Sequence, residues 1–438
     1  MRIRVILLLG ALALTSAVGG AAGRAATTPP TFANFAAPAP VGRDAGEPSI
    51  GADWGTGNVM FQAGLETLRV SNFDSANGSA TWLSVGSTLT SAITLDPILW
   101  TDHATGRTFV SQLSADCSLL AFSDDDGTRW TQNPVGCGIA SGADHQTVGG
   151  GAFATAPGGV GYPNAVYYCA QAIATAQCAV SHDGGLVFDP AVPIYTALQC
   201  GGLHGHVKVA PDGTAYVPNA DCGGKSAVVV STDNGTTWAV RAVPDSSTQD
   251  ESDPSLGLGA GGTVYFAYAS ATGHPFAAVS RDRGRTWTKS VDLGASFGIQ
   301  NTQFPSVVAG DDDRAAVAFL GTPTGGDDQK SSFAGVWHLY VATTYDGGAT
   351  WTTVDATPSD PVQRGCIWLG GGSNTCRNLL DFMDVTVDAL GRVVVGYADG
   401  CTGTCVSGGT NTHSALATIA RQSGGTGLFA AKDGQITG

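Results

Sequence analysis

The chain has 438 residues, only 13% of them charged, and a formal net charge of −15. Only three of the 36 acidic residues are Glu, and only five of the 21 basic residues are Lys. Because Glu and Lys are strong helix formers, their scarcity argues against a helical bundle or coiled coil. The 62 Gly, with abundant Asp, Ser and Thr, suit turns between short strands. The acidic balance also argues against nucleic acid and anionic membranes as partners.

The first 26 residues have the pattern of a signal peptide. Arg2 and Arg4 precede an apolar run over 5–14, and small residues follow at 21–23. This run is too short to span a bilayer and has a cleavage region behind it. We therefore expect a secreted, extracellular protein, with residues 27–43 forming a linker after the signal peptide.

Two motifs then alternate along the chain. The first is a polar or proline-containing entry into an apolar strand, as in Glu47-Pro48-Ser49-Ile50, followed by a turn and a second strand. The second motif, Ser/Thr-x-Asp-x-Gly-x-x-aromatic, follows a third apolar strand, as in Ser231 to Trp238. Its Asp can bond nearby backbone N–H groups and its Gly accepts a positive φ, so each copy predicts a β-hairpin turn, which we call a clasp. The five complete clasps carry Asp125, Asp183, Asp233, Asp282 and Asp346.

Seven such units, counting degenerate clasps at 71–82 and 423–429, predict an all-β fold. Each unit supplies four antiparallel strands, and repetition of four-stranded sheets is typical of a β-propeller. We expect a seven-bladed β-propeller, with a six-bladed one as the alternative, in a single domain over 44–430. Residues 431–438 would form a C-terminal tail, and the protein would be a monomer.

The clasps resemble the Asp-box of the sialidase (BNR-repeat) superfamily. The resemblance covers residues 44–430 and implies a propeller that acts on or binds glycans. Sialidases of this family carry an Arg-Ile-Pro motif near the first strand, whereas Glu47 stands at the matching place here. True sialidase activity is therefore disfavoured, and an acidic rim would repel an anionic sugar.

The strand entries supply the candidate catalytic residues. Loops entering the inner strands of a propeller gather on one face, and we expect the functional surface there. Paired carboxylates cut glycosidic bonds as acid and base, which favours a glycoside hydrolase. The alternatives are a polysaccharide lyase using His with Tyr162 or Tyr168, and a non-catalytic propeller that binds glycan or protein. The candidates are Glu47, Asp96, Asp144, His145, His204, His206, Glu251 and Asp253, and the same register places Asp102 and His103 on this face.

No cofactor is required by this chemistry. Asp144, His204 and His206 are nevertheless a candidate site for a divalent metal such as calcium or zinc. Asp311-Asp312-Asp313 is expected in a turn on the opposite face. The ten Cys of an exported chain predict disulfides, and local pairing is the simplest arrangement. In order they form five neighbouring pairs: Cys117 and Cys137, Cys169 and Cys178, Cys200 and Cys222, Cys366 and Cys376, Cys401 and Cys405.

Overall fold

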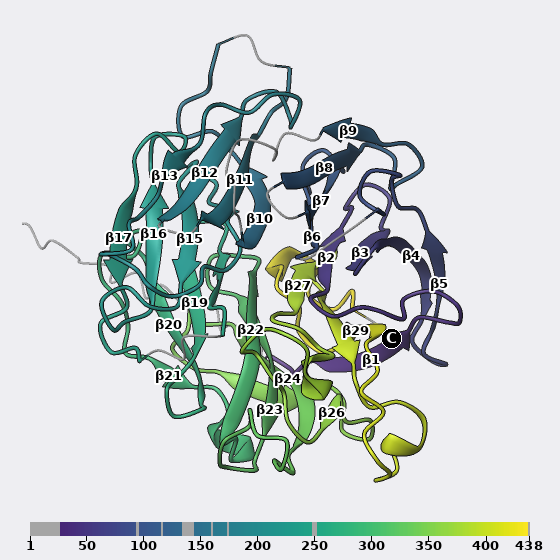
Figure 1. The fold of residues 1–438 in the computed structure, drawn as a ribbon. Helices are drawn as coiled ribbons and strands as arrows, with labels where there is room; N and C mark the ends of the chain where they lie inside the picture. Colours follow the sequence, from purple (N-terminus) through teal and green to yellow (C-terminus); the bar gives the residue numbers. More distant parts are fainter. Residues whose placement is uncertain are drawn as a thin grey trace, which may run out of the picture.

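The computed structural model describes residues 27–92, 96–114, 117–133, 144–158, 161–172, 175–247 and 252–436. Seven antiparallel sheets surround a central axis, and five of the inner strands, β2, β6, β10, β22 and β27, are labelled around the centre in Figure 1. The prediction of a seven-bladed β-propeller is confirmed, and the six-bladed alternative is wrong. The predicted signal peptide lies outside the described residues.

The first four blades follow the chain from inner to outer strand. Blade 1 contains β2 (Ser49–Ala52), β3 (Val59–Ala63), β4 (Glu66–Asp74) and β5 (Ser79–Ser84). Blade 2 contains β6 (Ile98–Thr101), β7 (Thr108–Ser114), β8 (Cys117–Ser123) and β9 (Thr131–Asn133). Blade 3 contains β10 (Asp144–Gly151), β11 (Ala165–Ala172), β12 (Thr175–Ser181) and β13 (Val192–Pro193). Blade 4 contains β14 (Lys208–Val209), β15 (Ala215–Asn219), β16 (Ala227–Ser231) and β17 (Ala239–Ala242).

Blades 5 to 7 carry short 3-10 helices in their loops. Blade 5 contains β18 (Ser255–Leu258), β19 (Val264–Ala269), β20 (Pro275–Ser280) and β21 (Val291–Asp292). Blade 6 contains β22 (Asn301–Ala309), β23 (Ala315–Thr322), β24 (Val336–Thr344) and β25 (Thr352–Asp355), and β26 (Gln363–Arg364) also pairs with β24. Blade 7 contains β27 (Asp384–Val387), β28 (Val393–Asp399), β29 (Leu416–Gly424) and β1 (Thr31–Ala36). The helices are η1 (Ala295–Phe297), η2 (Thr375–Arg377), η3 (Gly403–Cys405) and η4 (Ala430–Lys432).

The two ends of the chain close the ring together. β1 pairs with β29 as the outer strand of blade 7, and the two lie side by side in purple and yellow in Figure 1. Residues 27–43 were expected to form a linker, but they supply this strand. The segment after blade 7 also packs on the propeller, because Arg314 forms an ion pair of 2.7 Å with Asp433. Blade 7 is therefore completed by strands from both ends of the chain.

A ring of side-chain hydrogen bonds ties the inner strands to one another. The Val207 N–H donates to Thr147 Oγ1 at 3.0 Å, and the Val307 N–H donates to Ser255 Oγ at 3.0 Å. Asp384 plays the same part in blade 7, because its Oδ2 accepts from Ile50 N at 3.3 Å. These side chains therefore fix blade 3 to blade 4, blade 5 to blade 6 and blade 7 to blade 1.

The clasps lie between the third and fourth strands, as their order in the sequence predicts. In the clasp of blade 4, Ser231 Oγ donates to Asp233 at 2.9 Å and accepts from Gly235 N at 2.9 Å. Asp233 also accepts from the Thr237 N–H at 2.9 Å and the Thr237 hydroxyl at 2.6 Å. Asn234 and Gly235 have φ of 55° and 79°, so the Gly serves the turn as expected. The corresponding bond from Gly N–H to Ser or Thr recurs in the other four complete clasps.

Covalent links support the loops of blades 3, 4, 6 and 7. Within the described residues the disulfides join Cys169 to Cys178, Cys200 to Cys222, Cys366 to Cys376 and Cys401 to Cys405. These are four of the local pairs that the spacing predicts. The fifth predicted pair joins Cys117 to Cys137, and Cys137 lies outside the described residues. None of the helices in the described part of the chain is long and apolar enough to cross a membrane.

Candidate functional site

Four side chains form an acidic cluster at the strand-entry end of the channel. Glu47 enters blade 1, Asp96 enters blade 2, and Arg377 and Asp381 come from the loop before blade 7. Arg377 donates to both Asp381 oxygens, at 2.5 and 2.6 Å, and these two side chains are 18% and 15% exposed. Glu47 is only 2% exposed. A single cation therefore faces three carboxyl groups.

Glu47 holds its proton more tightly than an ordinary Glu. Burial raises the pKa of Glu47 well above its usual value, and the charges of Asp96 and Asp381 raise it further. The close approach of the Asp381 carboxyl group favours the protonated form of Glu47 in the same direction. Glu47 has a positive φ of 55°, a strained conformation that the Leu379 carbonyl helps to hold by accepting from the Glu47 N–H at 3.2 Å.

A histidine cluster lies beside the acidic cluster. His145 Nε2 lies 3.4 Å from Asp253 Oδ1, which joins blade 3 to blade 5. The His145 and His204 rings are 6.4 Å apart. Both histidines and Asp253 are less than a tenth exposed. The His145 N–H donates to Asp96 Oδ2 at 3.1 Å, so Asp96 connects the two clusters. Glu47, Asp96, His145, His204 and Asp253 are thus brought together from five blades.

The other predicted site residues are placed differently. Glu251 lies outside the described residues, as does the side chain of Asp144. The His206 ring lies 4.7 Å from the Phe382 ring, and His206 lines both the channel cavity and a small pocket that Asp253 borders. In the described part of the chain no three His, Cys, Asp or Glu side chains form a metal-ligand set. The metal site at Asp144, His204 and His206 remains a prediction.

Asp102 and His103 lie on the opposite face, so their predicted position is wrong. β6 ends at Thr101, and both residues fall in the turn after it rather than in the loop before it. Asp102 accepts from the Tyr162 hydroxyl at 2.6 Å, which places this lyase candidate on the clasp face as well. Tyr168 is buried and bonds Ser118. The Asp311–Asp313 segment is in the β22–β23 turn as expected, where Asp312 accepts from the Gly261 and Thr263 N–H groups.

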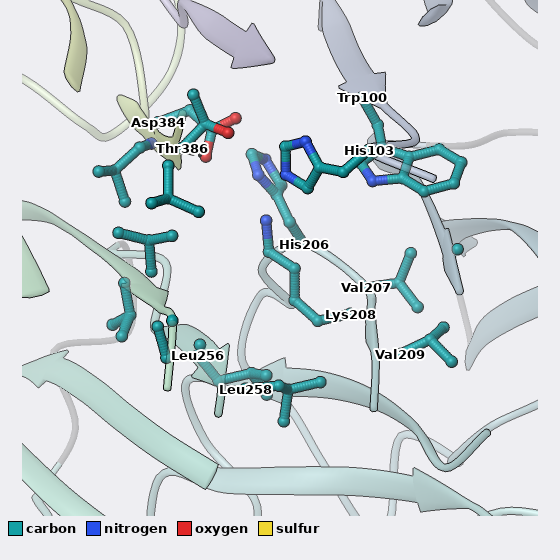
Figure 2. A pocket seen from close by; sticks show the side chains of 18 of the residues that line it. Trp100, His103, His206, Val207, Lys208, Val209, Leu256, Leu258, Asp384 and Thr386 are labelled. Atoms are coloured by element: carbon teal, nitrogen blue, oxygen red, sulfur yellow. Dashed lines mark hydrogen bonds between the residues drawn. The ribbon is translucent and has the colours of Figure 1, made fainter. Parts of the chain in front are cut away.

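Below the polar clusters the channel contains a cavity of about 330 Å³. Its walls are mostly aliphatic side chains of the inner strands, such as Val207, Val209, Leu256 and Leu258 (Figure 2). Its lining extends to Trp54, which is 38% exposed in the turn after β2. The cavity therefore opens on the clasp face, the opposite end from the face we expected to be functional.

Two charged residues that the sequence reasoning passed over are central to these sites. Arg377 lies in a long insertion before blade 7, and its only signal was the four-residue spacing to Asp381. Lys208 lies in β14, two residues after His206. Alternate residues of a strand share a face, so a lone Lys beside His206 could have been assigned to the channel.

Comparison with known proteins supports the fold and nothing finer. No family model matches the chain, and no curated protein matches it. A GH74 enzyme from Niastella koreensis is similar with a TM-score of 0.52 and 18% identity, over 84% of this chain and 53% of that one, so this chain spans about half its length. A protein of unknown function from Dyadobacter fermentans DSM 18053 has a TM-score of 0.45 at 14% identity, covering 89% and 98% of the two chains. The microbial sialidase Hz136 has a TM-score of 0.44 at 14% identity, covering 84% and 73%.

Proposed function

We propose that the protein is an extracellular glycoside hydrolase of the sialidase-like propeller type, acting at the acidic cluster on the strand-entry face. The observation that carries the proposal is the buried Glu47, whose pKa is raised by burial and by the neighbouring carboxyl groups of Asp96 and Asp381. Cleavage of a glycosidic bond needs one carboxyl group that still holds its proton near neutral pH and one that is ionised. The Asp-box-like clasps and the disulfides fit this type of secreted propeller.

The roles follow from burial and charge. The Glu47–Asp381 pair would supply the proton to the departing sugar oxygen, and Asp96 would act as base or nucleophile. Arg377 would hold Asp381 in place beside Glu47 through two hydrogen bonds. Transfer of that proton leaves Glu47 negative beside Arg377, which can stabilise the new charge. If Asp96 is the nucleophile, the water that hydrolyses the glycosyl–Asp96 bond returns a proton to Glu47. If Asp96 is the base, it takes the proton of the attacking water and releases it to solvent, and Glu47 is reprotonated from solvent.

A second candidate is glycan binding without catalysis. It is favoured by the burial of Glu47, which exposes 2% of its surface and would need a movement of the cluster to meet a substrate. The lyase alternative is weakened by the position of Tyr162, whose hydroxyl bonds Asp102 on the other face. The histidines of blades 3 and 4 are its remaining support.

A glycan panel assayed with four proteins tests the proposal. We expect the wild type to release reducing ends without an unsaturated product, and E47Q and D96N to lower kcat by about 10²- to 10⁴-fold. D44N is the matched control, because Asp44 is exposed three residues before Glu47, and it should keep full activity. An unsaturated product would indicate a lyase. Binding without any product would indicate the non-catalytic alternative.

A further inference from the structure

The cavity on the clasp face has the size and composition of a ligand site distinct from the acidic cluster. Its volume of about 330 Å³ is within the range of small-molecule pockets, roughly 300–1,000 Å³. Its walls are mostly aliphatic, which favours the apolar part of a ligand. Glu47, Asp96, Arg377 and Asp381 do not line this cavity, so the two sites are built from different residues.

Among the described residues that line this cavity, Lys208 is the only Lys or Arg. Figure 2 shows its side chain directed toward the rings of His206 and His103. Among the described residues the Lys208 ammonium has no hydrogen bond or ion pair; its charge acts on His103, His206 and Asp384 only from a distance. A cation in such a setting favours an anionic partner.

Asp384 also borders the cavity, but it does not serve as the anionic partner of Lys208. Its carboxylate accepts from the Ile50 N–H at 3.3 Å and from the Val385 N–H at 2.9 Å, and it is hydrogen-bonded to Ser306 as well. These bonds hold Asp384 in the ring that ties the blades together. Its oxygens are therefore engaged by the Ile50 and Val385 N–H groups and by Ser306.

The two histidines complete the polar end of the cavity. Burial lowers the pKa of His206 well below its ordinary value, and Lys208 lowers it further, so the ring is neutral and can donate one hydrogen bond. His103 Nδ1 bonds the Ala52 carbonyl at 2.8 Å, and its ring stacks on Trp54 at 4.5 Å. His103 and Trp54 thus form a fixed aromatic wall near the mouth.

We propose that this cavity binds a small amphipathic carboxylate, with Lys208 bonding the carboxylate and the aliphatic channel walls enclosing the apolar tail. His206 lies where it can donate a second hydrogen bond. The site is separate from the proposed hydrolase cluster, so either can be right without the other.

Isothermal titration with octanoate, octanol and octylamine tests this assignment. We expect octanoate to bind at least about tenfold more tightly than the two matched probes, because only octanoate offers an anion to Lys208. K208M should weaken octanoate binding at least about tenfold and leave octanol unchanged. K289M is the matched control, because Lys289 is exposed on the surface, and it should bind octanoate like the wild type.

A second variant keeps the test decisive if K208M fails to fold. A309W places a large side chain in the cavity without removing charge, and it should abolish octanoate binding. The proposal is overturned if octanoate does not bind, if the three probes bind equally, or if octanoate binding survives in A309W or in folded K208M.

Discussion

The two faces of the propeller are built in opposite ways. Each complete clasp on one face is a turn of eight residues whose Asp bonds groups two to four residues away. On the other face the acidic and histidine clusters collect side chains from six blades, with Arg377 and Asp381 supplied by the loop before blade 7. Local turns can recur unchanged, whereas a cluster around the axis needs each blade to contribute a different residue.

The difference extends to electrostatics. The clasp carboxylates accept hydrogen bonds from their own turns, as Asp233 does from Ser231 and Thr237, so each stabilises its own turn. On the entry face, burial and the charges of Asp96 and Asp381 raise the pKa of Glu47. Stored repulsion of this kind costs stability and is typical of functional sites. Variants in the two regions should therefore behave differently.

The largest effect is expected from removing the cation of the acidic cluster. R377M leaves three neighbouring carboxyl groups without their positive charge, and we expect the free energy of unfolding to fall by about 3 kcal/mol. The loss should shrink toward acid pH, because protonation of the carboxyl groups removes the repulsion. Urea unfolding measures it, with R43M as the exposed control. Equal stability of the two variants would show that the cluster does not depend on Arg377.

Glu47 should leave a signature in the pH dependence of stability. Because its folded pKa lies above the unfolded value of about 4.5, the wild type loses stability as pH rises from there through the folded pKa. Gln does not titrate, so the stability of E47Q relative to the wild type should increase over this pH range. The increase in the relative free energy of unfolding should be about 1.4 kcal/mol for each unit by which the pKa of Glu47 is raised. Parallel unfolding curves of the two proteins from pH 4 to 8 would contradict a raised pKa.

The smallest of these effects is expected in a clasp. D233A removes the acceptor of the turn and should cost about 1 kcal/mol while leaving activity unchanged. Burial acts to raise the pKa of Asp233, but hydrogen bonds from Thr237 and Ser231 outweigh burial and lower this pKa below 3.8. Asp233 therefore contributes its full stabilisation above pH 3.8, the unfolded pKa, and loses it as the pH falls through the folded pKa. The difference in stability between the wild type and D233A should disappear in strong acid. A D233A protein of full stability that had lost activity would place the functional surface on the clasp face.

Patterns of short range were readable in the sequence. The clasps, the sevenfold strand order and the four described disulfides depend on residues within about one blade of each other. The entry motif also located Glu47, Asp96, His145, His204 and Asp253, because residues at one register of a repeat meet at one end of a propeller. The same reasoning failed for Asp102 and His103, since a strand of four residues is too short for its end to be fixed by pattern alone.

The sequence alone determined the propeller, since turn chemistry and strand alternation act over a few residues and repeat seven times. Tertiary structure decided which side chains meet. It brought Arg377 to Glu47 from the far end of the chain and set Lys208 in an aliphatic cavity on the clasp face. It also paired β1 with β29, which made a predicted linker the outer strand of the last blade. These contacts join residues that are distant in sequence, and ring closure, which no local pattern encodes, is what places them together.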